Sequence, residues 1–436
     1  MEKEKFDLST NRMTQLSICA PYTTPTMHYF TGGKRHNLKR GKDLVRAMSE
    51  HIAYPSNINI VNTSFLIGMP ILAVTSLVYY SMNYGISWFE PIIFLMFYLA
   101  SGLSITAGYH RLFSHKTHKA AWPLRLFYAL FGAAAFQNSA IKWCSDHRVH
   151  HRKTDKEEDP YSVTKGFFWA HVGWVMVDID KDDVDNVKDL QADKILAWQD
   201  RNIFLIGFLV GILLPALIGM AWVGGIHGFL GGLVYGGFIR VVVVHHATFL
   251  INSAAHTWGT QPYSTENSSR DSPLLSFLTF GEGYHNFHHT FQADYRNGHK
   301  WYHWDPSKWL IKSASWVGLT SDLYKIPTKA IESRRMKRTI DKKSDGNEID
   351  SQLQEKFTEC IAQLRTGFTD LIERRKEYKL AKQSKNTQTK NHWRAIKEGH
   401  KIKIKQCKIR IAKARIEFKY LVQSMRLTNN VKAIAA

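Results

Sequence analysis

Two long regions of the chain are almost free of charged side chains, whereas the segments around them are rich in charge. Residues 51–110 contain only Glu90, and residues 202–265 contain only Arg240. A helix of about 20 apolar residues crosses the hydrocarbon core of a bilayer, so each region is long enough for two crossings joined by a tight turn. The pattern therefore predicts two hairpins of membrane-spanning helices.

The expected fold is an all-α integral membrane protein with four transmembrane helices, a cytoplasmic helical cap and a C-terminal helical hairpin. The spans are expected at about 58–80, 88–109, 203–222 and 226–249. They divide the chain into a cytoplasmic N-terminal segment, a membrane domain and a basic C-terminal extension, at residues 1–54, 55–324 and 325–436.

The distribution of basic residues predicts the orientation. The turns at 81–87 and 222–228 contain no Lys or Arg, whereas the loop at 111–201 and the chain after 266 contain many. The N-terminal segment is also basic, with Lys34, Arg35, Lys39, Arg40, Lys42 and Arg46. By the positive-inside rule both termini and the long loop are cytoplasmic. No apolar signal peptide is expected before Arg46.

The four cysteines favour a reducing compartment. Cys19, Cys144, Cys360 and Cys407 lie far apart and form no C-x-x-C pair. They are expected to be free thiols, which agrees with a cytoplasmic face.

The C-terminal extension is strongly basic and has helical periodicity. Residues 325–436 hold 29 Lys and Arg against 12 Asp and Glu, which gives +17 of the chain's net charge of +21. Apolar residues recur every three or four positions from Phe357 to Leu371 and again from Trp393 to Met425, so a helical hairpin is expected. The hairpin is either a solvated charged pair or a surface for anionic lipid headgroups. Nucleic acid is not an expected partner, because the membrane already accounts for the positive charge.

Histidines cluster next to the predicted spans. GYHRLFSH follows the second span, DHRVHH lies in the cytoplasmic loop, INSAAH ends the fourth span, and GEGYHNFHH follows it. Spacings of three and four put side chains on one helical face, so each HxxHH is expected to direct three imidazoles at one point. His110 and His115, five apart, do not share a helical face well and are expected where the helix frays. Asn252 and His256 are expected to reach the same cavity.

The four motifs together contain nine histidines. One tetrahedral zinc takes only four ligands, so two metal ions are expected. Imidazole alone permits Fe, Zn, Cu or Ni, and the residues do not name the metal.

These boxes, in this order beside two helical hairpins, resemble the membrane-bound acyl-lipid and acyl-CoA desaturases, above all the stearoyl-CoA (delta-9) group. The resemblance rests on AGYHRLFSHKTHKA, AFQN, KWCSDHRVHH, GFFWAHVGW, INSAAHTWGTQPY and GEGYHNFHHTFQADYR, and it covers roughly residues 55–320. It implies an acyl-CoA desaturase that uses O2 and two iron ions (Fe2+/Fe3+) to insert a cis double bond, of the delta-9 type, into a saturated fatty acyl chain.

The resemblance also implies the roles of particular residues. The metal ligands would be His110, His115, His147, His150, His151, His256, His285, His288 and His289, with Asn252 binding through a water. The acyl tunnel would be shaped by Gln137, Asn138, Trp143, Asp146, Thr248 and Phe249. No catalytic residue is expected beyond the metal ligands. Asp155 and Asp159 are expected either to orient ligand imidazoles or to be surface carboxylates.

Some positions depart from the animal enzymes. Ser145 stands where they carry an arginine, and acidic residues follow HVGW where they carry basic ones near the coenzyme A phosphates. Fatty acyl-CoA stays the first expectation for the substrate, with a phospholipid-linked or carrier-protein-linked chain as the alternative. His245 is expected to be a structural histidine or to line the tunnel. Arg240 is expected to face the protein interior or the cytoplasmic end.

The extension has no HPGG-like haem segment, so a separate electron donor is expected, such as cytochrome b5 or a ferredoxin with its reductase. The expected location is the bacterial inner membrane or the endoplasmic reticulum. A fatty acid or alkane hydroxylase with the same histidine boxes is the alternative enzyme. A non-enzymatic protein, such as a metal transporter or a membrane-surface adaptor that uses the basic extension, is disfavoured, because the first two spans have almost no ionisable residues to pass an ion.

Overall fold

The computed structural model describes residues 27–31, 34–38, 57–178, 184–344, 350–383 and 389–435. Most basic residues of the N-terminal segment, Cys19 and part of the acidic stretch after HVGW lie outside the described residues. Two antiparallel strands, β1 (Met27–Thr31) and β2 (Lys34–Leu38), pair with Met27 opposite Leu38. They belong to a unit separate from residues 60–436.

Four helices among the described residues are long and apolar enough to cross a membrane, which confirms the predicted number. The first is α2 (Ile60–Tyr84). The second is α3 (Phe89–Leu103), continued by the π-helix η1 (Ser104–Ser114). The third comprises α9 (Ile203–Phe208), the π-helix η5 (Leu209–Leu213) and α10 (Leu214–Trp222). The fourth comprises α11 (Gly225–Gly231), the π-helix η6 (Gly232–Ile239), α12 (Arg240–Asn252) and the 3-10 turn η7 (Ala254–His256).

The second and fourth of these helices run beyond the ends expected from hydropathy. They reach Ser114 rather than 109 and His256 rather than 249. Polar residues in these added turns are buried, among them Arg111 and His256, because cap helices pack around them. Hydropathy measures compatibility with lipid, so it does not detect helical turns that are buried in protein.

The second hairpin is held by direct backbone contact. A Cβ at Gly219 in α10 would lie 2.0 Å from the carbonyl oxygen of Gly228 in α11, and the reverse distance is 2.2 Å. Only glycine fits there, as is typical of closely packed membrane helices. The turn between them contains Gly224 with φ +94°, a left-handed conformation that favours glycine.

Arg240 faces the interior of the bundle, one of its two expected places. It is fully buried and donates to the carbonyl oxygens of Gly236 at 2.9 Å, Gly211 at 2.5 Å and Ala134. Gly211 and Gly236 lie in the π-helices η5 and η6, where helical hydrogen bonding is irregular. The guanidinium thus satisfies backbone carbonyls that lipid could not.

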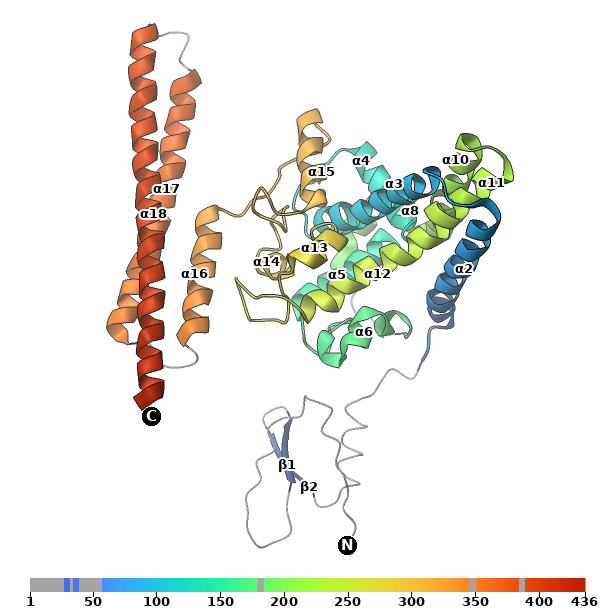
Figure 1. The fold of residues 1–436 in the computed structure, drawn as a ribbon, viewed down its shortest axis with the longest axis horizontal. Coiled ribbons are helices and arrows are strands. Elements are labelled where there is room, and N and C mark those ends of the chain that lie inside the picture. Colours follow the sequence, from blue (N-terminus) through green and yellow to red (C-terminus); the bar gives the residue numbers. More distant parts are fainter. Residues whose placement is uncertain are drawn as a thin grey trace. The chain divides into compact units, whose positions relative to one another are not determined.

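The cap is built from short elements that lie between and after the spans. Its helices are α4 (Trp122–Ala133), α5 (Ala140–Lys153), α6 (Phe167–His171), α7 (Lys188–Gln191), α8 (Lys194–Arg201), α13 (Pro273–Leu278), α14 (His285–Thr290) and α15 (Pro306–Ala314). Its 3-10 turns are η2 (Val163–Lys165), η3 (Gly173–Val175), η4 (Val184–Val187) and η8 (Ser315–Val317), and β3 (Lys119–Ala120) pairs antiparallel with β4 (Thr320–Ser321). In Figure 1, α5 and α14 lie close to the end of α12.

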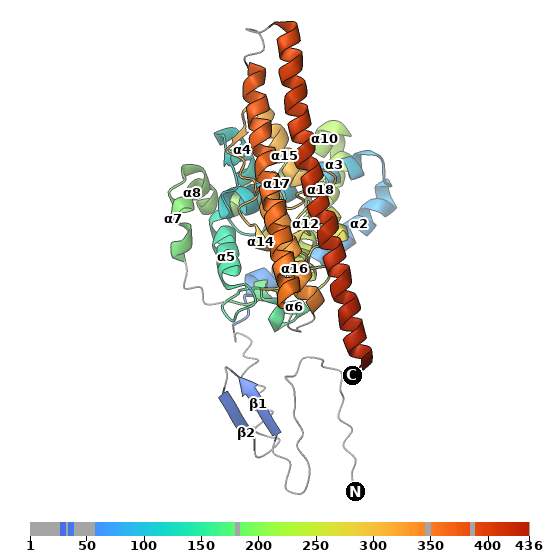
Figure 2. The ribbon, with the colours of Figure 1, turned by 90° about the vertical axis from the view of Figure 1, so that its left-hand side faces the viewer.

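The C-terminal extension forms α16 (Thr328–Ser344), α17 (Ser351–Gln383) and α18 (Lys390–Ala435). Helices α17 and α18 lie side by side in both Figure 1 and Figure 2, as the predicted hairpin requires. Their shared core contains residues of both predicted apolar runs, among them Phe357, Leu364, Ile411 and Phe418. Helix α16, which was not predicted, packs on α17 and on the cap.

Candidate metal centre

Nine histidines form two groups whose ligand atoms converge. His110, His115, His147, His151 and His288 form one group, and His150, His256, His285 and His289 form the other. Within each group one ring nitrogen per residue lies within 4.8 Å of all the others. The nine imidazoles predicted from sequence are therefore brought together, as two sets of five and four, and each set can hold a metal ion.

A π-helix brings His110 and His115 into the same group. The backbone N–H of His115 donates to the carbonyl oxygen of His110, five residues earlier, at 3.1 Å. A π-helix has this i to i+5 hydrogen-bonding pattern, so side chains five apart lie on the same side. The expectation that the helix frays here was wrong: the segment Ser104–Ser114 is helical and buried.

The two HxxHH motifs do not each direct three imidazoles at one point, and that expectation was also wrong. In α5, His147 and His151 join the first group and His150 joins the second. In α14, His285 and His289 join the second group, whereas His288 joins the first. Residues i and i+4 lie about 40° apart on the helix, whereas the histidine at i+3 lies about 60° from the first and about 100° from the second, so each motif can contribute to both sites.

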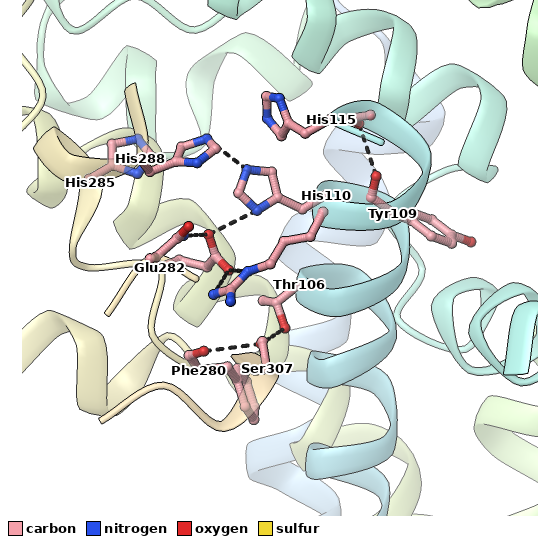
Figure 3. Close-up of polar contacts among 12 residues, drawn as sticks. Thr106, Tyr109, His110, His115, Phe280, Glu282, His285, His288 and Ser307 are labelled. Atoms are coloured by element: carbon pink, nitrogen blue, oxygen red, sulfur yellow. Dashed lines mark hydrogen bonds and ion pairs between the residues drawn. The ribbon is translucent and has the colours of Figure 1, made fainter. Parts of the chain in front are cut away.

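Close nitrogen contacts define each group. In the first, His288 Nε2 lies 3.0 Å from Nε2 of His110 and 3.0 Å from that of His151. In the second, His285 Nε2 lies 3.0 Å from His256 Nε2 and 3.1 Å from His289 Nε2. Figure 3 shows His110 between His288 and Glu282. The Nε2 atoms therefore face inward, as metal ligands would.

The Nδ1 atoms of several of these histidines are held by groups on the outer side. Asp159 accepts from His150 Nδ1 at 2.9 Å, and Glu282 Oε2 lies 2.9 Å from His110 Nδ1. Contacts of this kind fix the ring orientation and tautomer of metal-bound histidines. Asp159 was expected either to orient a ligand imidazole or to be a surface carboxylate, and its contact with His150 fits the first role. Glu282 was missed, although it lies three residues before His285 in GEGYHNFHH.

Asp155 contacts a histidine of the second group indirectly, through Ser268. It accepts from the N–H and the hydroxyl of Ser268 at 2.6 Å each, and Ser268 Oγ lies 2.7 Å from His256 Nδ1. Sequence reasoning missed Ser268, because nothing in the local pattern links a loop serine to a histidine twelve residues earlier.

A buried ionic network supports the first group. Arg111 donates to Glu282 Oε1 at 2.8 Å and contacts Asp305 Oδ1 at 3.0 Å, and all three side chains are at most 2% exposed. Gly281 has φ +98°, and a Cβ there would lie 2.6 Å from Asp305 Oδ1. Glycine at 281 thus lets the chain turn against Asp305, and the next residue, Glu282, contacts both Arg111 and His110.

The protonation states suit metal binding. Burial lowers the pKa of His115, His147, His151, His288 and His289 well below the usual value, and it lowers the pKa of His285 to about 3. Burial alone would raise the pKa of Glu282, but His110 and Arg111 outweigh it and lower that pKa to about 2. These six imidazoles are therefore neutral at physiological pH, which metal ligation requires.

A cavity adjoins the first group. His110 and His147 form part of its wall, and all six residues expected to shape the substrate tunnel line it: Gln137, Asn138, Trp143, Asp146, Thr248 and Phe249. Gln137 Nε2 donates to Thr248 Oγ1 at 2.9 Å, which links the segment before α5 to α12. His245 also lines the cavity and lies 2.8 Å from the carbonyl oxygen of Ala135.

Asn252 and His256 separate in the structure. Asn252 lines this cavity with His110, whereas His256 belongs to the second histidine group. Helix α12 ends at Asn252, and the 3-10 turn that follows redirects the chain, so the spacing of four no longer gives a shared face. Binding of Asn252 through a water stays a prediction.

Replacing Asp159 with asparagine is expected to weaken metal binding in the four-histidine group about 10–100-fold, the usual effect of removing a carboxylate behind a ligand histidine. Asp159 is fully buried and contacts His150 alone among the nine histidines in the described part of the chain. Chelator competition on the purified full chain measures this. Equal retention of both ions in the variant and the parent would contradict the assigned role.

His118, a buried histidine outside both groups, is expected to make the folded chain less stable as pH decreases. Burial, with the nearby charge of Arg111, lowers its pKa to about 3. Since an unfolded histidine titrates near about 6.5, the unfolded chain binds more protons below that pH, and stability is lost as pH falls from there towards 3. His118→Leu should therefore lose less thermal stability than the parent between pH values of about 7 and 5. An unchanged pH dependence in detergent would refute this.

Comparison with known proteins assigns the membrane helices and most of the cap to one family. A family model described as fatty acid desaturase matches residues 61–313. Acyl-CoA desaturase 1 of Saccharomyces cerevisiae is 42% identical over 281 residues, which cover 63% of this chain and 54% of that protein. A probable acyl-CoA desaturase of Schizosaccharomyces pombe is 40% identical over 282 residues, covering 63% and 57%. Acyl-CoA desaturase of Ovis aries is 38% identical over 254 residues, covering 56% and 69%. The chain thus spans just over half the length of the two yeast relatives.

Proposed function

The chain belongs to the fatty acid desaturase family, and from this premise we propose that it converts a saturated fatty acyl chain to a monounsaturated one. The observation that carries the proposal is the cavity whose wall contains His110 and His147 of the five-histidine group. An acyl chain in this cavity would present its methylene groups directly to the metal centre.

The proposed reaction removes two hydrogen atoms from adjacent methylenes. One O2, two electrons and two protons are consumed, and two waters are formed with the double bond. An unactivated methylene pair offers no acid, base or electrophile for side chains to use, so metal ions that activate dioxygen supply the chemistry. We propose two iron ions, one in each histidine group. Neutral nitrogen donors suit iron but also suit other transition metals.

The chain's own residues would position the substrate and exclude water. Trp143 and Phe249 form apolar walls of the cavity, and the Gln137–Thr248 hydrogen bond ties its two sides together. A bound acyl chain would be held in one conformation beside the metals, which sets the position of the double bond. We propose the delta-9 position and cis geometry.

Acyl-CoA is the proposed carrier of the chain, because several relatives are named acyl-CoA or stearoyl-CoA desaturases. The electrons are proposed to come from a separate acidic carrier protein, such as cytochrome b5 or a ferredoxin. The proposed location is the endoplasmic reticulum or a bacterial inner membrane, with the active site cytoplasmic. Anionic lipid headgroups are the proposed partner of the C-terminal extension.

Expression in cells that lack monounsaturated fatty acids tests the reaction. The lipids of cells with the parent chain are expected to gain double bonds, and those of cells with His288→Ala are not. Hydroxylated acyl chains would instead support a hydroxylase with the same histidine groups. Unchanged lipids in the presence of a working electron donor would overturn both.

A further inference from the structure

Helix α18 has an exposed apolar stripe that the helical hairpin does not use. One face packs on α17 and is buried, with Cys407, Ile411, Ala414, Phe418 and Met425. The other side carries four large apolar side chains that are 46–68% exposed: Ile402, Ile409, Ile416 and Tyr420. The proposed desaturase reaction gives this stripe no role.

The stripe is straight and lies opposite the buried face. A helix turns about 100° per residue, so these four residues fall within about 40° of one another and nearly 180° from Ile411. From Ile402 to Tyr420 the rise is about 27 Å. The exposed fractions agree with this geometry, since Ile411 is 4% and Ile409 46% exposed.

Basic residues flank the stripe on both sides. Lys401, Lys405, Lys408 and Lys419 follow one edge, and Lys403 and Arg410 follow the other, by the same helical angle. Between Arg394 and Tyr420 the sequence has ten Lys or Arg and two Glu. A second copy of the helix is a poor occupant, because pairing two such stripes would set lysine against lysine.

We propose that α18 lies along an anionic phospholipid surface, with Ile402, Ile409, Ile416 and Tyr420 in the headgroup–acyl boundary and the flanking lysines at lipid phosphates. An apolar stripe bordered by Lys and Arg is the arrangement of helices that lie in the membrane interface. The membrane helices tether α18 near a bilayer, so a modest intrinsic affinity suffices. This inference rests on the proposed partnership of the C-terminal extension with anionic lipid headgroups, but it does not depend on the desaturase reaction.

The test uses the full chain in nanodiscs of phosphatidylcholine alone or with phosphatidylserine. An environment-sensitive fluorophore is attached at Ile409→Cys or, as a control, at Thr366→Cys on the exposed side of α17, both in a Cys19→Ser background because the other cysteines are buried. The Ile409 probe is expected to shift to shorter wavelength and to be quenched by lipid-attached spin labels in the anionic discs. The Thr366 probe should not respond.

Two charge variants test whether the lysines beside the stripe are required. The triple variant Lys401→Gln, Lys405→Gln and Lys408→Gln should abolish the response, whereas Lys356→Gln, Lys376→Gln and Lys379→Gln, which remove equal charge from α17, should leave it intact. Equal responses at both probe positions, or in both lipid mixtures, would overturn the proposal. So would a shift that needs two chains per disc, which would identify a second copy as the occupant. No arm reads desaturase activity, so failure here leaves the proposed reaction standing.

Discussion

His288→Ala is expected to remove the metal ion of the five-histidine group and to lower product formation by more than about 100-fold. Substitution of residues behind metal ligands already costs about 10–100-fold, and His288 is placed as a ligand itself. Its Nε2 lies 3.0 Å from those of His110 and His151, so its loss leaves a gap at the centre of the group. Metal analysis of the purified chain should show one of two ions lost.

The matched control is His227→Ala. His227 lies in the second hairpin, stacks on Tyr84 with ring centroids 5.0 Å apart, and belongs to neither histidine group. It should retain both ions and full activity. If His288→Ala kept both ions while activity disappeared, a role in binding substrate would replace the role as ligand.

Arg111→Met is expected to destabilise the folded chain by about 3–5 kcal/mol, the usual cost of removing one partner from a buried ion pair. The substitution leaves the buried carboxylates of Glu282 and Asp305 without the cation that both contact. Because Glu282 also contacts His110 Nδ1, the five-histidine group should lose metal affinity as well. Thermal unfolding in detergent and metal retention measure the two effects.

Arg415→Met provides a control with the same chemical change at the surface. Arg415 contacts Glu332 at 2.9 Å, but the two side chains are 46% and 26% exposed, so a loss of at most about 1 kcal/mol is expected. The double variant Arg111→Met and Glu282→Gln should recover part of the stability lost by Arg111→Met, because it removes one unpaired carboxylate. Equal destabilisation by Arg111→Met and Arg415→Met would show that the buried network is not important for folding.

Local pattern was sufficient for the spanning helices and for the C-terminal helical hairpin. The two regions interrupted only by Glu90 and Arg240 predicted two hairpins of spanning helices, and the apolar repeats after Phe357 predicted the helical hairpin. These features are repeated over many residues, and each depends on whether a side chain meets lipid, water or a neighbouring helix. Histidine spacing likewise identified all nine converging imidazoles, since histidine is uncommon enough for such clusters to stand out.

The tertiary structure alone decided how those histidines divide. The sequence of α5 does not show that His150 leaves His147 and His151 to meet His256, which is more than one hundred residues away. Nor does it show that a π-helix unites His110 and His115, or that Glu282 contacts both His110 and Arg111. Sequence periodicity therefore fixes which face of a helix a side chain occupies, whereas packing against distant segments decides what that face meets.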